Sequence, residues 1–157
     1  MRVALGADHA GFQLKEALKR VLNDMGVEHQ DFGASSASSV DYPDYAQAVA
    51  QCVAAGEFDR GILVCGSGIG MSIAANKVSG IRAAPIVDTQ TARLAREHND
   101  LNILTLGARF IPESRAREIV REFLRTPFEG GRHVRRVDKI HKIEPGLIAT
   151  RPSHSTA

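Results

Sequence analysis

A cysteine followed by a glycine-rich loop is the part of this sequence best suited to chemistry. Cys65 comes directly after the apolar run 61–64, and glycines alternate with other residues after it, at Gly66, Gly68 and Gly70. Glycines let a backbone approach a ligand closely, and their N–H groups can hold a phosphate or a developing oxyanion. We expect a helix to begin within this loop, where free N–H groups and the helix dipole favour a thiolate. The segment is therefore interpreted as an anion-holding turn with a reactive thiol; the alternative is a buried cysteine beside a tight turn.

Apolar runs that alternate with segments of helical period predict the fold that positions this loop. Such alternation is typical of parallel strands joined by right-handed helical crossovers. We expect an α/β protein, a Rossmann-like three-layer α/β/α sandwich with about five parallel strands. The expected strands are 2–6, 27–32, 61–64, 81–87 and 102–106, and the expected helices begin after Gly11, at 41–44, at 70 (to 77), at 89 (to 97) and at Pro112.

The bulk composition fits one globular domain. The chain has 157 residues, 43% of them hydrophobic and 24% charged, and its net charge of +2 argues neither for nucleic acid nor for an anionic membrane as a partner. Asp8 and His9 come too early for a signal peptide, and no apolar run reaches the length of a membrane span. We expect a cytoplasmic protein with a single domain over 1–143 and a flexible tail over 144–157.

The two cysteines predict free thiols rather than a disulfide. A cytoplasmic setting keeps thiols reduced, and Cys52 falls in the apolar stripe of the helix that begins near 41–44, where it is expected to be inert core. No CxxC or HxxxH spacing is present. The sequence therefore suggests neither a metal site nor a cofactor.

Polar or glycine-rich positions follow most of the expected strands. Asp8 and His9 follow the first strand, Cys65 the third, Asp88 the fourth, and 107–109 the fifth. Ligands of open parallel sheets bind beyond the carboxyl ends of the strands. Each position alone is explained as well by turn chemistry, but their convergence at one edge of the sheet favours a ligand site.

A dinucleotide site is the competing interpretation of the loop, because Asp88 lies after the next strand at a suitable distance for a ribose-binding acid. The match is poor, because the GxGxxG pattern requires a small residue where this chain has Met71. Two further features stay open. Arg132 and Arg136 form either a phosphate clamp on one helical face or a solvated basic segment, and His98 is either a helix C-terminal charge partner or a functional group.

Several segments together resemble the ribose-5-phosphate isomerase B family. They occur in the family's order along most of the chain and form a specific set: 6–11 (GADHAG), 41–43 (DYP), 64–70 (VCGSGIG), 74–77 (AANK), 97–100 (EHND) and 129–133 (EGGRH). The resemblance implies a cofactor-free and metal-free aldose–ketose isomerase of the pentose phosphate pathway, which converts D-ribose 5-phosphate and D-ribulose 5-phosphate through a cis-enediolate.

The resemblance also implies roles for individual residues. Cys65 is the general base, Ser67 and the loop N–H groups stabilise the enediolate, His98 assists opening of the sugar ring, and Asp8 handles protons of the hydroxyls. The implied substrate-binding residues are His9, Tyr42, Gly66, Gly68, Ile69, Gly70, Asn99, Arg109, Arg132, His133 and Arg136. Of these, Arg132 and Arg136 bind the phosphate with help from His9, Arg109 and His133.

Two departures from the family pattern bear on these roles. Ser67 stands where many members have threonine, which keeps the hydroxyl. Another branch has a glutamate base at the position of Met71; methionine cannot take a proton, so Cys65 is left as the base. Sites in the family lie between subunits, which implies a homodimer or a dimer of dimers.

Two alternatives to this function remain at this point. Related isomerases act on tetrose phosphates, allose 6-phosphate or galactose 6-phosphate, so the sugar is less certain than the reaction. A protein of another class, a non-catalytic nucleotide-binding domain, would use the loop only to hold a phosphate.

Overall fold

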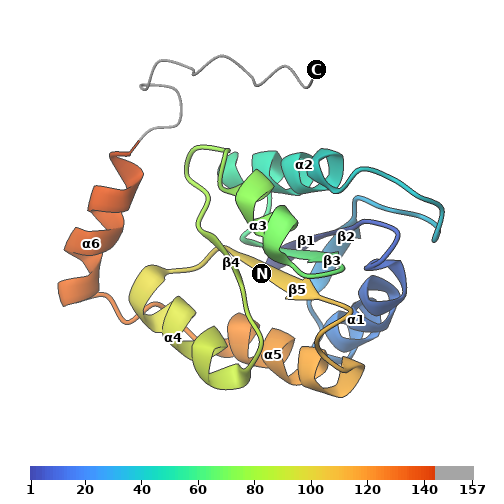
Figure 1. The fold of residues 1–157 in the computed structure, drawn as a ribbon. Coiled ribbons are helices and arrows are strands. Elements are labelled where there is room, and N and C mark those ends of the chain that lie inside the picture. Colours follow the sequence, from blue (N-terminus) through green and yellow to red (C-terminus); the bar gives the residue numbers. More distant parts are fainter. Residues whose placement is uncertain (144–157) are drawn as a thin grey trace, which may run out of the picture.

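The computed structural model describes residues 1–143, and the tail expected at 144–157 lies outside the described residues. Five parallel strands form one sheet in the order β2-β1-β3-β5-β4 (Figure 1). The strands are β1 (Arg2–Ala7), β2 (Glu28–Asp31), β3 (Arg60–Cys65), β4 (Ala83–Pro85) and β5 (Ile103–Gly107). The helices are α1 (Phe12–Asp24), α2 (Tyr42–Ala54), α3 (Ile69–Ala75), α4 (Thr89–Asn99), α5 (Glu113–Arg125) and α6 (Arg132–His141).

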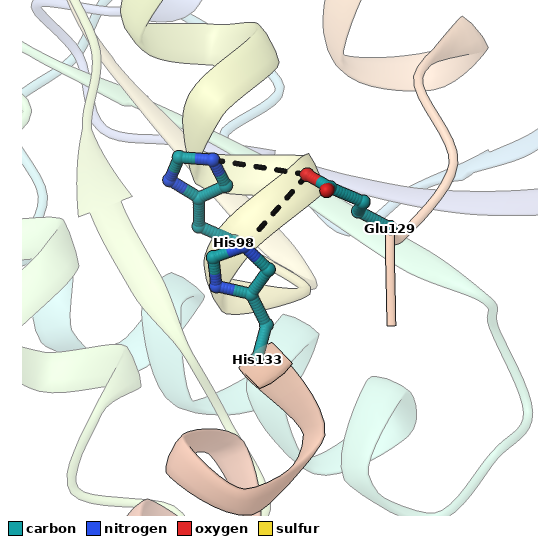
Figure 2. Close-up of side chains that lie close together, drawn as sticks. All are labelled: His98, Glu129 and His133. Carbon is teal, nitrogen blue, oxygen red and sulfur yellow. Dashed lines mark ion pairs between the residues drawn. The ribbon is translucent and has the colours of Figure 1, made fainter. Parts of the chain in front are cut away.

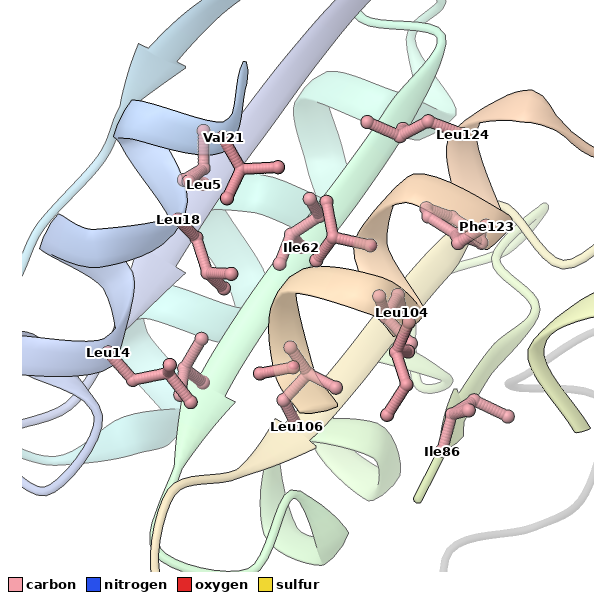
Figure 3. Packing of buried hydrophobic residues seen from close by; sticks show 14 of the residues in the cluster. Leu5, Leu14, Leu18, Val21, Ile62, Ile86, Leu104, Leu106, Phe123 and Leu124 are labelled. Carbon is pink, nitrogen blue, oxygen red and sulfur yellow. The ribbon is translucent and has the colours of Figure 1, made fainter. Parts of the chain in front are cut away.

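Helices cover both faces of the sheet, as the alternating pattern predicts. Side chains of β3 alternate between the faces: Ile62 and Val64 pack into the core beneath α1 and α5, shown in Figure 3, whereas Leu63 and Cys65 pack into the core beneath α2 and α3. The strand is buried on both sides, which explains its continuous apolar run. The predicted three-layer α/β/α architecture is confirmed.

Three elements are shorter than predicted. The strand expected over 27–32 is β2, and the strand expected over 81–87 is only β4, an edge strand that pairs with β5 alone. Before β4, the backbone N–H of Arg82 bonds to the side chain of Asn102 (2.8 Å) and not to a strand backbone. The helix expected over 70–77 ends as α3 at Ala75, and turn hydrogen bonds follow it.

The basic segment after Gly131 is a helix, α6, which sequence reasoning left open. Gly130 and Gly131 have φ values of +71° and +54°, so they adopt the left-handed conformations that glycine tolerates best and turn the chain into the helix. His133 and Val137 are the buried residues of α6, and they lie on one face of it one turn apart.

Both cysteines are free thiols. Cys52 lies on α2 and is only partly buried, so the expectation of a core residue holds for its packing against the cluster beneath α2 but not for full burial. Burial and the nearby charge of Glu57 raise the pKa of the Cys52 thiol. Among the helices of residues 1–143, none has the length and apolar character needed to cross a membrane.

Candidate active site

The cysteine loop lies at the carboxyl end of β3, where the strand passes into α3. The backbone N–H of Gly68 donates a hydrogen bond to Sγ of Cys65 (3.1 Å), and the thiol is 5% exposed. Gly68 has φ of +78°, which allows the backbone to turn its N–H back toward the sulfur. The N–H of Ile69, the first residue of α3, bonds to Oγ of Ser67 (3.2 Å). The loop therefore places the thiol within hydrogen-bonding distance of a backbone donor.

The loop is held from behind by β5 and the turn that follows it. Oγ1 of the fully buried Thr105 donates to the carbonyl of Gly68 (2.7 Å), and the N–H of Ala108 donates to the carbonyl of Cys65 (2.8 Å). Gly107 passes so close to the loop that a Cβ there would lie 2.6 Å from the carbonyl oxygen of Ser67. Because these contacts fix both ends of the turn, the loop geometry is set by the core.

An open cavity of about 570 Å³ lies in front of the loop. The residues predicted from sequence that line it are Asp8, Tyr42, Cys65, Gly66, Ser67, Ile69, Gly70 and Arg109, and they are joined by Ile73 and Phe110. The lack of a side chain makes room for a neighbouring side chain at two of these positions. A Cβ at Gly70 would lie 2.6 Å from the ring of Tyr42, and one at Gly66 would lie 3.1 Å from the guanidinium of Arg109.

Asp8 and His9 follow β1 next to this cavity. Asp8 is buried, and its Oδ1 accepts the N–H of Gly11 (3.0 Å) at the start of α1. His9 does not line the cavity; its Nδ1 accepts the N–H of Val40 (3.3 Å) and so ties the loop before α2 to the β1 turn. Asp88 caps α4 by accepting the N–H of Thr91 (2.7 Å). This contact is the turn chemistry that the sequence allowed for Asp88 as the alternative to ribose binding.

A second group of predicted residues lies at the opposite edge of the sheet. α4 follows the carboxyl end of β4 and leads back to the amino end of β5. Its last residues, His98 and Asn99, therefore lie at the end of the sheet opposite the cavity. α6 contacts this end of α4, and Figure 1 shows it beyond the β4 side of the sheet. The structure therefore does not bring His98, Asn99, Arg132, His133 or Arg136 to the Cys65 cavity of the same chain.

This second group has a defined geometry (Figure 2). The imidazoles of His98 and His133 stack at 4.3 Å between centroids with an interplanar angle of 11°. Oε2 of Glu129 lies 3.9 Å from Nε2 of His98 and 3.7 Å from Nε2 of His133. Burial, followed by the charge of His98, lowers the pKa of His133. Arg132 and Arg136 project from the exposed face of α6, and within residues 1–143 neither has a carboxylate partner.

Besides the cavity residues Ile73 and Phe110, sequence reasoning missed Thr105 and Glu129. Thr105 lies in the middle of a strand and gives no signal of its own, because its role depends on the approach of the Gly68 carbonyl from the loop after β3. Glu129 stands four residues before His133, a spacing that a scan for histidine and cysteine pairs does not find.

The fold and the cavity together define an α/β protein with a thiol and backbone donors at the carboxyl edge of a parallel sheet. A family model described as Ribose/Galactose Isomerase matches residues 3–140. The chain belongs to this family, as its sequence motifs indicated.

Close relatives and solved structures support the assignment. A putative sugar phosphate isomerase of Bacillus subtilis is 51% identical over 145 residues (92% of this chain, 97% of the relative), and ribose-5-phosphate isomerase B of Escherichia coli is 48% identical over 143 residues (91% and 96%). The structure of Clostridium thermocellum ribose-5-phosphate isomerase B is similar with a TM-score of 0.90 at 50% identity (91% and 97%). That of Mycoplasma genitalium ribose-5-phosphate isomerase B with bound ribulose-5-phosphate gives a TM-score of 0.86 at 42% identity (90% and 94%).

The support of the loop by Thr105 can be tested by removing its hydroxyl. Thr105→Val leaves the buried Gly68 carbonyl without its donor, and we expect the free energy of unfolding to fall by about 1–3 kcal/mol. Thr91→Val is the matched control, because Thr91 makes the same kind of bond at an exposed position, where water replaces it. Urea unfolding of both variants measures the difference. Equal losses in the two variants would show that β5 does not hold the loop.

Proposed function

We propose that this protein interconverts D-ribose 5-phosphate and D-ribulose 5-phosphate. The observation that carries the proposal is the thiol of Cys65, which lies at the cavity with the Gly68 N–H directed at its sulfur. Family membership and relatives named ribose-5-phosphate isomerase B support the substrate class.

Cys65 is the proton-transferring base of the proposed reaction. Its thiolate takes the proton from C2 of the open-chain aldose, the electron pair moves toward the carbonyl oxygen to give a cis-enediolate, and the same proton is returned to C1 of the ketose. Ser67 and the N–H groups of 66–70 stabilise the charge on the enediolate oxygens. Met71 stands where another branch of the family has a glutamate base; here the side chain is fully buried and cannot accept a proton. The reaction is redox-neutral, so it requires no cofactor.

The remaining residues bind and prepare the sugar. Asp8, buried beside the loop, exchanges protons with the sugar hydroxyls, and His98 assists ring opening. Tyr42 and Asn99 position the sugar. The phosphate is bound by three residues of α6, Arg132, His133 and Arg136, together with His9 and Arg109 near the cavity of the other chain.

The proposed assembly is a homodimer, or a dimer of dimers, in which each site combines the cavity of one chain with the α4–α6 group of another. Two observations support it: the two groups lie at opposite sheet edges of one chain, and apolar side chains around the cavity are exposed. Ile69, Ile73 and Phe110 are 56%, 58% and 74% exposed, and a second chain would remove this apolar surface from water. We also propose a cytoplasmic location, where both thiols stay reduced.

Replacement of the base should abolish turnover but not binding. In Cys65→Ala we expect kcat to fall by roughly 10²- to 10⁴-fold, with KM changed little, because the thiol acts on a proton and does not hold the phosphate. Cys52→Ala is the matched control and should keep full activity, as should the wild-type protein after EDTA treatment. A coupled assay of ribulose 5-phosphate formation measures both, and full activity of Cys65→Ala would refute the role of the base.

The choice of sugar is tested by comparing substrates of different length. Members of the same family act on other sugars, so tetrose, pentose and hexose aldose phosphates are compared side by side. We expect the largest kcat/KM for ribose 5-phosphate, by at least about 10-fold, because a site that positions both the reacting carbons and a distant phosphate discriminates by chain length. A larger kcat/KM for a tetrose or hexose phosphate would retain the isomerase reaction but reassign the substrate.

A further inference from the structure

Three side chains at the junction of α4 and α6 form a cluster suited to a metal ion. His98 comes from the end of α4, Glu129 from the segment before α6, and His133 from the first turn of α6 (Figure 2). One possible ligand atom of each residue lies within 4.8 Å of the other two. Glu129 has no part in the proposed isomerisation, so the reaction does not explain why its carboxylate faces both imidazoles.

His133 shows that this cluster is incomplete. Its side chain is 95% buried, since its exposure is 5%, and its Nε2 has no hydrogen-bond partner among the described residues. A buried nitrogen without a partner costs about 1–3 kcal/mol, so it is expected to face a ligand.

The spacing of the three groups favours an ion between them over direct contact. The separations of 3.9 and 3.7 Å from Oε2 of Glu129 to the two Nε2 atoms are too long for hydrogen bonds. Ligands bound to Zn²⁺ at about 2.0–2.2 Å in a tetrahedron are roughly 3.3 Å apart, so a small closure completes the site. The rings are nearly parallel, so the ring of His98, with 37% of its side chain exposed, has to turn for both Nε2 atoms to meet one ion.

We propose that His98, Glu129 and His133 bind one Zn²⁺ ion and that this ion inhibits the enzyme. Two imidazole nitrogens and one carboxylate oxygen suit Zn²⁺ better than Mg²⁺ or Ca²⁺, which prefer oxygen ligands, and water fills the fourth position. An imidazole whose Nε2 is bound to zinc can no longer exchange a proton at that atom. The inhibition, but not the binding, rests on the proposed role of His98 in ring opening.

Zinc binding is tested first without any use of activity. Zn²⁺ is added to the full-length Cys52→Ala, Cys65→Ala protein, which has no thiol ligands, in competition with a chromophoric chelator. We expect one ion per chain, and Glu129→Gln should weaken the affinity by at least about 10-fold, because it removes a ligand. Glu118→Gln on α5, an exposed glutamate paired with Arg115, is the matched control and should bind as tightly as the parent. Absence of binding, or equal affinity in Glu129→Gln, would overturn the site.

Inhibition is then measured with the wild-type thiols in place. We expect free Zn²⁺ to inhibit ribose 5-phosphate isomerisation over the range in which it binds, whereas Glu129→Gln keeps its basal rate and needs at least about 10-fold more zinc. Equal inhibition of the two proteins would refute the inhibitory role. A protein that binds zinc through Glu129 but isomerises no sugar phosphate would instead refute the proposed function and leave the site intact.

Discussion

The common direction of the five strands decides which residues of this chain can meet. All strands end at one edge of the sheet, so the turns after β1, β3 and β5 bring Asp8, Cys65 and Arg109 to a single cavity. The same geometry sends the last turn of α4, with His98, to the other edge. A site that uses both groups therefore needs two chains, and the exposed apolar side chains around the cavity are consistent with such an interface.

The conformation of the cysteine loop after β3 depends on buried hydrogen bonds more than on the loop's own sequence. Glycine makes the turn possible, since Gly68 adopts a left-handed conformation and Gly107 passes against the Ser67 backbone. Glycine alone does not fix the conformation of the loop, however, because glycines also allow many unfolded conformations. The hydroxyl of Thr105 and the N–H of Ala108 select one arrangement, in which the Gly68 N–H faces the sulfur of Cys65. These bonds hold the thiol in a position that is almost fully buried.

The fold and the carboxyl-edge half of the site could be predicted from sequence because both depend on local patterns. The buried strand β3 is a continuous apolar run, and Cys65 follows it directly, so strand direction alone places the thiol at the edge. The length of β4 could not be predicted in this way, because it depends on which neighbour the strand pairs with. Thr105 and Glu129 were missed for a related reason: each acts on a residue brought near by tertiary structure.

The α4–α6 group unites the two proposals made for this protein. His98 serves ring opening in the proposed reaction and is a ligand in the proposed zinc site, so occupancy by zinc and turnover exclude one another. The proposed reaction, and with it the inhibition by zinc, places the α6 face of one chain over the Cys65 cavity of another, whereas zinc binding itself uses residues of one chain. The reaction and its inhibition share the claim that a working site is assembled from two chains.

Mixing two inactive variants tests that claim most directly. Cys65→Ala lacks one half of each site and His98→Ala lacks the other, so each homodimer is expected to be inactive. After subunit exchange in an equal mixture, half of the dimers carry both variants, and each of these has one intact site, which predicts about a quarter of the wild-type activity. Activity that stays at the level of the separate variants, with exchange verified by mass spectrometry, would contradict a site shared between chains.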